Sequence, residues 1–369
     1  MDFTLTAAQD DLGGLTRQIL TDQVTPERLR EFDDDGARFD QALWAELARA
    51  GILAAALPEF VGGSGLGLLE RCSVLIEIGR TVAPVPYLAS IALGAAAIAG
   101  FGTPEQQQTW AAPAGRGDIV IAAALAEDEC DDPAAPATNA REIDGGWQLT
   151  GTKTSVLAAA EADLLLVPAR APSGVGVFVV VPGDTGVSIE PQRVTGGDGT
   201  ARVTLAGVFV PADRLLGDLG PAVASWLAAH ATVGLCALQL GVTERALELT
   251  AAYARSREQF GKPIGSFQAV SQRLADGFVD VEGIRLTLWQ AAWRLTAGLP
   301  ADTEVATAKF WAAEAGHRVA HTAVHIHGGV GIDTDGDVHR YFTAAMHNEF
   351  ALGGATAQLR RIGAALATS

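Results

Sequence analysis

The chain has 369 residues, with 26 Lys and Arg against 43 Asp and Glu, and a net charge of -17. This charge would repel a nucleic-acid backbone or an anionic lipid surface, so neither is expected as a partner. The length exceeds what one hydrophobic core usually serves, and two or three packing units are therefore expected.

The cysteines, Cys72, Cys130 and Cys236, lie far apart and show no metal-ligand spacing. A sparse, odd set is typical of a reducing compartment and argues against a disulfide framework. The first residues lack the basic stretch and apolar core of a signal peptide, and no run of 18 apolar residues occurs. We therefore expect a cytoplasmic protein without a membrane span.

Residues 1–118 are predicted to form an N-terminal helical domain. Apolar residues recur there at three- and four-residue intervals, as in Phe39, Leu43 and Leu47. Thr103-Pro104 has the pattern of a helix start, with a capping residue before a first-turn proline. Residues 89–101 are apolar but short and interrupted by glycine, which predicts a buried helix.

Residues 119–219 are predicted to form a middle antiparallel, β-barrel-like domain. Short apolar runs at 147–150, 164–167, 177–181 and 203–205 are separated by Gly, Pro and Asp. Asp144-Gly145-Gly146 is a hairpin-type turn. The helical period returns in residues 220–369, with helices expected at 221–255, 267–297, 301–327, 335–350 and 355–367. This order predicts an α+β fold ending in a four-helix bundle domain.

Two segments resemble the acyl-CoA dehydrogenase family. Arg257, Phe260-Gly261, Ile264 and Gln268 follow the spacing of that family's Arg-x-x-Phe-Gly-x-x-Ile-x-x-x-Gln signature. The segment 325–331, His-Ile-His-Gly-Gly-Val-Gly, resembles the Gln-x-x-Gly-Gly-x-Gly segment near the C-terminus of the same family. Weaker matches follow in the family's order along essentially the whole chain.

The resemblance implies a helical domain, a β-domain and a helical bundle, with FAD as cofactor and an acyl-CoA thioester as substrate. In such enzymes a Glu removes the α-proton while hydride leaves Cβ for the flavin, so the cofactor supplies the redox chemistry. The resemblance also implies that FAD lies across a subunit interface, and that electron-transferring flavoprotein is the electron acceptor.

The residues that the family uses for a neighbouring subunit's flavin are retained in this sequence. An arginine offers a fork of donors to a diphosphate, an aromatic ring packs on a flavin or adenine, and glycines let backbone amides approach phosphate. The predicted cofactor-binding residues are Arg257, Gln259, Phe260, Gln268, His325, Gly328 and Gly329.

Less specific interpretations of these residues were weighed. Arg257 by itself is more typical of a surface salt bridge, and Gly328-Gly329 of a helix-terminating turn. His321, His325 and His327 suggest a metal cluster by spacing, but no nearby Cys or paired carboxylate completes one, so no metal site is predicted.

The residues that would hold the chain's own flavin ring are missing. Where the family has Leu-Thr-Glu-Pro followed by Gly-Ser-Asp, this chain has Leu-Ala-Glu-Asp-Glu at 125–129. Ala126 and Leu157 stand where hydroxyl side chains contact the ring, and neither can donate a hydrogen bond. Glu127 and Glu129 are expected to sit poorly beside an anionic flavin.

The catalytic Glu is missing as well, so no catalytic residue is predicted. Three family positions for this base are occupied by Leu352, Ala231 and Leu238. Glu349 and Glu244 are conceivable substitutes, but we expect both to be ordinary surface charges. A shift of one helical turn, about 5 Å, would normally take a base out of reach of its proton.

The sequence keeps the residues used for a neighbour's flavin and lacks those used for its own flavin ring and base. This pattern matches one class within the family. The chain resembles the base-lacking subunit of actinobacterial two-plus-two heterotetrameric acyl-CoA dehydrogenases, which often act on sterol-derived thioesters in steroid catabolism. The first hypothesis is therefore a subunit that completes the FAD site of a catalytic paralogue. The alternatives are a self-sufficient homo-oligomeric dehydrogenase with an unusual base such as Glu349, and a non-enzymatic or divergent structural partner.

Overall fold

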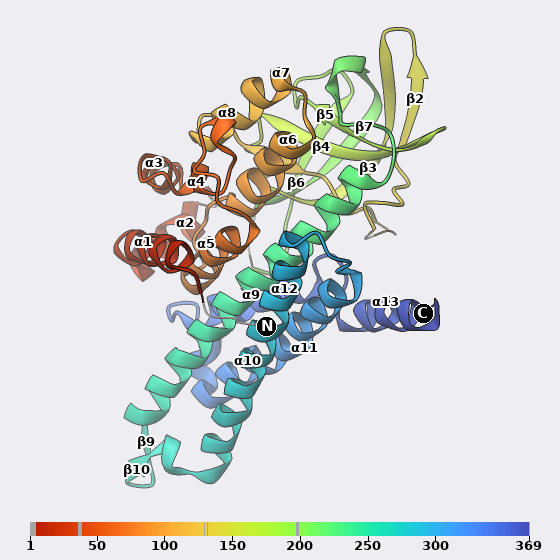
Figure 1. The fold of residues 1–369 in the computed structure, drawn as a ribbon. Coiled ribbons are helices and arrows are strands. Elements are labelled where there is room, and N and C mark those ends of the chain that lie inside the picture. Colours follow the sequence, from red (N-terminus) through yellow and green to blue (C-terminus); the bar gives the residue numbers. More distant parts are fainter. Residues whose placement is uncertain (1–4, 36–38, 129, 131, 197–198, 369) are drawn as a thin grey trace.

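The computed structural model describes residues 5–35, 39–128, 130, 132–196 and 199–368. Along the chain, helices are followed by a sheet and then by a second set of helices, as Figure 1 shows. The α+β architecture expected from the sequence is confirmed.

The N-terminal helices pack against one side of α9 (Ala222–Ser256), the long central helix. They are α1 (Ala7–Gln23), α2 (Pro26–Asp35), α3 (Gln41–Arg49), α4 (Ile52–Ala55), α5 (Leu68–Thr81), α6 (Ala96–Phe101), α7 (Pro104–Gln106) and α8 (Ala112–Gly115), with a π-helical segment at Leu88–Ala95. The predicted start at Thr103 is confirmed, because its side chain accepts a hydrogen bond from the backbone N–H of Gln106. The apolar segment Leu88–Phe101 is largely buried, as predicted.

The middle sheet follows a path of strands ordered β6-β7-β3-β2-β4-β5-β8. Its strands are β1 (Ile121–Ala123), β2 (Asn139–Ile143), β3 (Gly146–Leu157), β4 (Leu164–Ala171), β5 (Gly174–Val180), β6 (Val187–Gln192), β7 (Thr200–Pro211) and β8 (Leu215–Leu216). The predicted hairpin turn joins β2 to β3, whose ends pair at Ile143 and Gly146. The sheet was expected to be antiparallel. The structure differs from this expectation, because β1 runs parallel to β4.

The C-terminal helices form the bundle in the lower part of Figure 1, and α13 projects to its side. They are α9 (Ala222–Ser256), α10 (Gln268–Thr296), α11 (Asp302–His327), α12 (Val338–Phe350) and α13 (Ala355–Thr368). Their ends lie within three residues of the predicted ones. By length and hydropathy α9 could cross a membrane, but 72% of its most apolar window is buried inside the protein.

The two helical regions approach each other very closely where α5 and α9 cross. A Cβ placed on Gly241 would lie 1.9 Å from the carbonyl oxygen of Ile76, and one on Gly79 would lie 2.1 Å from that of Leu238. Only glycine lets the two backbones come this close. One hydrophobic core extends across this crossing, and a second one lies inside the sheet.

Replacing Gly241 with alanine is expected to lower the free energy of unfolding by about 1–3 kcal/mol or more, because the new methyl group overlaps backbone atoms that cannot move independently. Gly14→Ala in α1 is the matched control, since a Cβ there meets no atom within 4 Å. That control should be neutral or stabilising by up to about 1 kcal/mol. Urea denaturation followed by circular dichroism measures both, and equal stabilities would contradict the tight crossing.

Candidate functional site

An exposed hairpin stands at the far end of the bundle, between α9 and α10. Strands β9 (Glu258–Gln259) and β10 (Lys262–Pro263) pair across the two-residue turn Phe260-Gly261. Both turn residues have positive φ, 54° and 76°, as a type I′ turn requires. A bulky residue in this conformation is an outlier, and Phe260 is in addition 93% exposed. Strained, exposed residues of this kind concentrate at functional sites.

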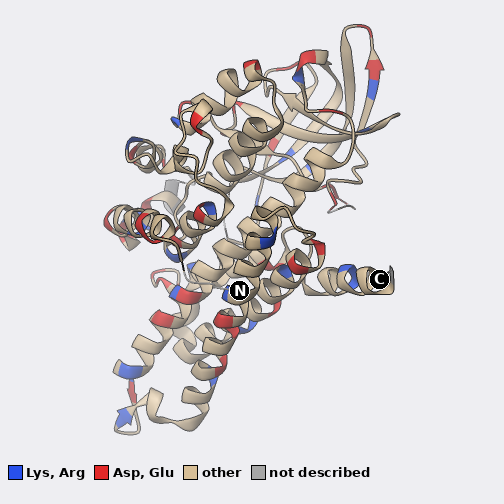
Figure 2. Ribbon diagram, viewed as in Figure 1, with Lys and Arg blue, Asp and Glu red and all other residues tan. Residues whose placement is uncertain are grey.

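The polar residues predicted around this hairpin also face solvent. Arg257, Gln259 and Gln268 are all exposed. The guanidinium of Arg257 forms no ion pair within the described part of the chain, so the salt-bridge interpretation of this residue is not realised there. Figure 2 shows basic and acidic segments close together at this hairpin. This end of the molecule therefore presents a cation and hydrogen-bonding amides that are free to contact another molecule.

The second motif lies next to the hairpin, at the end of α11. The ring of Tyr253, one helical turn before Arg257, stacks on that of His327 with 4.4 Å between centroids. Gly328 ends α11 with a φ of 64°, which is the turn that the sequence suggested. His325, Gly328 and Gly329 are exposed. A Cβ on Gly329 would meet no atom within 4 Å, so no packing within this chain requires a glycine there.

The three histidines whose spacing suggested a metal cluster do not share one set of neighbours. His327 is buried and its Nδ1 lies 2.9 Å from the carbonyl oxygen of Ala323. The ring of His321 contacts those of His317 and Phe342. In the described residues no three potential metal ligands come together.

The β-domain segment that would face the chain's own flavin is held by a buried ion pair. Lys153 is fully buried and its Nζ donates to Glu127 Oε1 at 2.7 Å. The same carboxylate accepts hydrogen bonds from the backbone N–H groups of Ala137 and Thr138 and from the Thr138 hydroxyl. Glu127 was expected to sit poorly beside an anionic flavin; the structure instead pairs its charge with groups inside the protein. Glu129 lies outside the described residues.

This environment sets the ionisation of Glu127. Burial opposes the charged form, but the hydrogen bonds from Lys153 and Thr138 outweigh it, so the pKa of Glu127 is held below its ordinary value. The carboxylate is therefore a structural charge that ties the 127–138 segment to β3.

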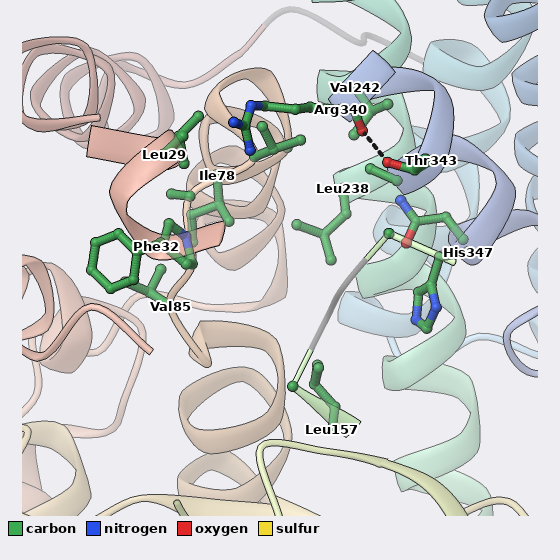
Figure 3. A pocket seen from close by; sticks show the side chains of 18 of the residues that line it. Leu29, Phe32, Ile78, Val85, Leu157, Leu238, Val242, Arg340, Thr343 and His347 are labelled. Carbon is green, nitrogen blue, oxygen red and sulfur yellow. Dashed lines mark hydrogen bonds between the residues drawn. The ribbon is translucent and has the colours of Figure 1, made fainter. Parts of the chain in front are cut away.

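A cavity of about 610 Å³ lies where the N-terminal helices, the sheet and the bundle meet. Its walls include α2, α5 and the segment 82–86 that follows it, α9, α12 and the turn after β3. In Figure 3, Leu157 lies toward one end and Arg340 toward the other, with Leu238 and His347 between them. Leu157, which was predicted to take the place of a ring-binding hydroxyl, contributes a hydrocarbon side chain to this wall.

Of the three family positions for the base, only Leu238 lines this cavity. Ala231 is buried among core residues. Leu352 has a φ of 56°, and its carbonyl oxygen accepts from Gln358 Nε2 at 3.1 Å. Lys309 Nζ donates to the carbonyl oxygens of Asn348 and Glu349, which fixes the end of α12 just before it. The backbone at this position is thus firmly held, but it presents an aliphatic side chain.

Comparison with known proteins decides the family. The model of the acyl-CoA dehydrogenase N-terminal domain matches residues 6–118, and that of the C-terminal domain matches residues 218–367. The chain belongs to the acyl-CoA dehydrogenase family.

Three relatives of this acyl-CoA dehydrogenase are especially informative. It is 52% identical to the acyl-CoA dehydrogenase FadE27 of Mycobacterium tuberculosis, over 100% of this chain and 99% of that protein. It matches a chain of the ChsE4-ChsE5 complex from Mycobacterium tuberculosis with a TM-score of 0.96, 53% identity and full coverage of both chains. It matches a chain of the Tcur3481-Tcur3483 steroid ACAD with a TM-score of 0.92, 42% identity and 98% coverage of each chain.

The two substitute carboxylates of this acyl-CoA dehydrogenase are less exposed than expected. The Glu349 side chain is 15% exposed, and its Oε2 lies 2.9 Å from His317 Nδ1. It is not among the residues that line the cavity. Glu244 is 11% exposed and forms ion pairs with Arg80 and Arg285, so the expectation of a solvated charge was wrong for it.

Sequence reasoning missed several polar residues that line the cavity, among them Glu161, Arg340 and His347. Burial raises the pKa of Glu161, whose Oε2 has no hydrogen-bond partner among the described residues. The available signal was its position, as a lone carboxylate in an alanine run directly after β3. Arg340 and His347 lie seven residues apart on α12, a spacing that puts them on one helix face.

Lys153→Met is expected to lower the free energy of unfolding by about 3–5 kcal/mol at neutral pH, because it leaves the Glu127 carboxylate buried without its cation. The wild-type carboxylate has a lowered pKa, so its contribution is complete above the ordinary value of 4.5 and is lost as pH falls through the folded-state pKa. The difference between the two proteins should therefore shrink on acidification.

Urea unfolding at pH 7 and at pH 4 measures this difference. The double variant Glu127→Gln with Lys153→Met is the control, since it removes both charges and should recover part of the lost stability. A difference that does not change between the two pH values would show that Glu127 is not the titrating partner.

Proposed function

We propose that this chain is the base-lacking subunit of a heteromeric, flavin-dependent acyl-CoA dehydrogenase, and that it completes the FAD site of a catalytic paralogue. The observation that carries the proposal is a contrast between the hairpin end and the cavity: only the hairpin end presents side chains suited to bind the cofactor. The hairpin end presents Arg257 and Phe260 to solvent. The cavity, in contrast, has Leu157 and Leu238 where ring-binding and base functions would be needed.

The residues at the hairpin end fit the diphosphate and adenosine part of FAD. Arg257 supplies a fork of donors, Gln259 and Gln268 supply amides, and the backbone around Gly329 is open to phosphate. When bound, FAD accepts the hydride that leaves the substrate. The chain's own cavity does not fit the flavin ring, because Ala126 and Leu157 offer it no hydrogen bond.

The distance between the two surfaces supports sharing across an interface. Leu238 and Arg257 are 19 residues apart on or at the end of α9, which corresponds to about 28 Å at 1.5 Å per residue. Groups this far apart serve different ends of a cofactor or different cofactors. The complexes named ChsE4-ChsE5 and Tcur3481-Tcur3483, which contain similar chains, support a paralogous partner.

A stripe on α10 is the contact surface that we propose for a partner subunit. Val279, Leu286 and Trp293 are spaced by seven residues and are 64%, 52% and 37% exposed. Side chains at this spacing lie on one helix face and pack against another helix. The hairpin directly precedes α10, so docking along this stripe would bring the hairpin against the same partner.

The substrate and its surroundings are part of the proposal. We propose an acyl-CoA thioester, of the sterol-derived class suggested by the steroid ACAD relative, as the substrate of the assembled enzyme. Electron-transferring flavoprotein as acceptor and a cytoplasmic location follow from the family and from the sequence.

Expression with and without the catalytic paralogue tests the proposal. The isolated chain should contain no flavin and show no dehydrogenase activity. Co-purification should restore about one FAD per heterodimer, measured by absorbance at the flavin band after protein quantification. A yellow, active homo-oligomer of this chain would reject the proposal and favour the self-sufficient alternative, in which Glu349→Gln should then abolish α-proton exchange.

Two substitutions separate cofactor contact from assembly. Arg257→Leu should leave the complex intact while weakening FAD retention about tenfold or more, since a hydrogen bond to a charged group contributes about 1.5–3 kcal/mol. Leu286→Asp should instead reduce assembly itself, because a charge would be buried in the contact. Gel filtration and flavin content measure both effects.

Matched controls lie outside the two proposed surfaces. Arg49→Leu on α3 and Phe209→Asp on β7 remove an exposed cation and an exposed aromatic elsewhere. Neither should change flavin content or assembly, and an equal effect at Arg49 and Arg257 would argue against a specific phosphate contact.

A further inference from the structure

We propose that His317 and His321, on the solvent-exposed face of α11, bind a divalent transition-metal ion. The inference goes beyond the proposed function and does not depend on it, because neither histidine belongs to the predicted flavin contacts or to the cavity lining. Among the described residues no three potential ligands meet, so the site consists of two ring nitrogens, and water fills the other coordination positions.

The two histidines are spaced as a helical chelate. Side chains four residues apart lie one above the other on a helix, and two histidines at this spacing bind Zn²⁺ in the His-Glu-x-x-His motif. His317 and His321 are both exposed, and their ring centroids are 4.2 Å apart. Two nitrogens on one tetrahedral zinc ion lie about 3.3 Å apart, so a small rotation of the rings brings a nitrogen of each onto the same ion.

The ring of His317 is already held by a carboxylate. Its Nδ1 lies 2.9 Å from Glu349 Oε2. A carboxylate only accepts hydrogen bonds, so Nδ1 is the donor, and the lone pair of the neutral ring lies on Nε2. Histidines that bind metals almost always donate their other ring N–H in this way, which fixes the tautomer and makes the ring a stronger ligand.

The groups around the two rings are themselves fixed. The Glu349 side chain is 15% exposed, and Lys309 Nζ donates to the Glu349 backbone carbonyl oxygen at 3.0 Å. The ring of His321 meets that of Phe342 edge to face, with 5.1 Å between centroids. A metal ion would therefore meet two side chains whose freedom is already restricted, as a preorganised site requires.

The charges near the pair favour a cation. Arg318 is shared between Glu314, one helical turn before His317, and Asp280. With Glu349 and Lys309 included, carboxylates outnumber cations, so a positive ion gains from the local field. Imidazole nitrogen suits Zn²⁺, Ni²⁺ and Cu²⁺, whereas Mg²⁺ and Ca²⁺ prefer oxygen ligands.

Isothermal titration calorimetry with ZnCl₂ tests the proposal on the full-length chain, in the oligomeric form in which it purifies. The affinity tag is removed first, and the protein is stripped with a chelating resin. One Zn²⁺ should bind per copy of this chain, and MgCl₂ at the same concentration should not compete. X-ray absorption should show the bound Zn²⁺ with two imidazole nitrogens at about 2.0–2.1 Å.

Variants of this chain assign the ion to the pair. His317→Gln and His321→Gln should each weaken Zn²⁺ binding at least tenfold, because one imidazole cannot chelate. Glu349→Gln should weaken it about tenfold while two imidazoles remain in the X-ray absorption spectrum, as expected of a positioning residue. His325→Gln is the matched control: it removes the next exposed histidine on α11 and should change Zn²⁺ binding less than threefold.

Circular dichroism of each variant checks that the fold is retained. Zn²⁺ binding that survives His317→Gln, that is lost equally on His325→Gln, or that Mg²⁺ displaces would overturn the proposal. Flavin content is measured separately on the same samples and should not change on His317→Gln, so failure of the proposed function and failure of this inference give different results.

Discussion

The arrangement of the molecule depends on the contact between the backbones of α5 and α9. Gly79 and Gly241 bring two helices together at a distance that no Cβ would permit. The crossing joins the N-terminal helices to the bundle in one core and sets the spacing of the cavity walls next to it. Because protein interiors are close-packed, a change at this crossing would be felt along both helices.

The helix α9 is the element that links the two candidate surfaces. It carries Leu238 in the cavity wall and then extends to the hairpin, where Tyr253 stacks against the end of α11. Glu244 lies between them and forms ion pairs with Arg80 of α5 and Arg285 of α10. The pair with Arg80 is also a hydrogen bond. The charge of Glu244 fixes three helices relative to one another, which positions the hairpin relative to the cavity.

Buried polar groups hold the backbone at the positions that the sequence predicted for base and flavin-ring contacts. Lys309 and Gln358 hold the backbone on either side of Leu352, and Lys153 with Glu127 holds the segment that would face a flavin ring. Uncompensated buried charges are costly, and the charged groups among them, Lys309, Lys153 and Glu127, all have hydrogen-bond partners. The backbone at these predicted positions is thus held by buried polar groups, and the side chains that it carries there, Leu157 and Leu352 among them, are aliphatic.

The sequence alone determined the order of helices and strands, the hairpin turn at Asp144-Gly145 and the family. These features depend on local period, turn residues and ordered motifs, which are readable without tertiary contacts. It also identified the residues of the hairpin end, because their spacing is local.

Only the tertiary structure decided the environment of single charges. Glu127 and Glu244 are partnered by residues 26 and about 160 positions away, Lys153 and Arg80, and sequence distance conceals such pairs. The parallel pairing of β1 with β4 and the cavity that is lined by both Leu157 and Leu238 also arise from segments distant in sequence. Local pattern determines which element a residue belongs to, but burial and charge pairing depend on what the rest of the chain places beside it.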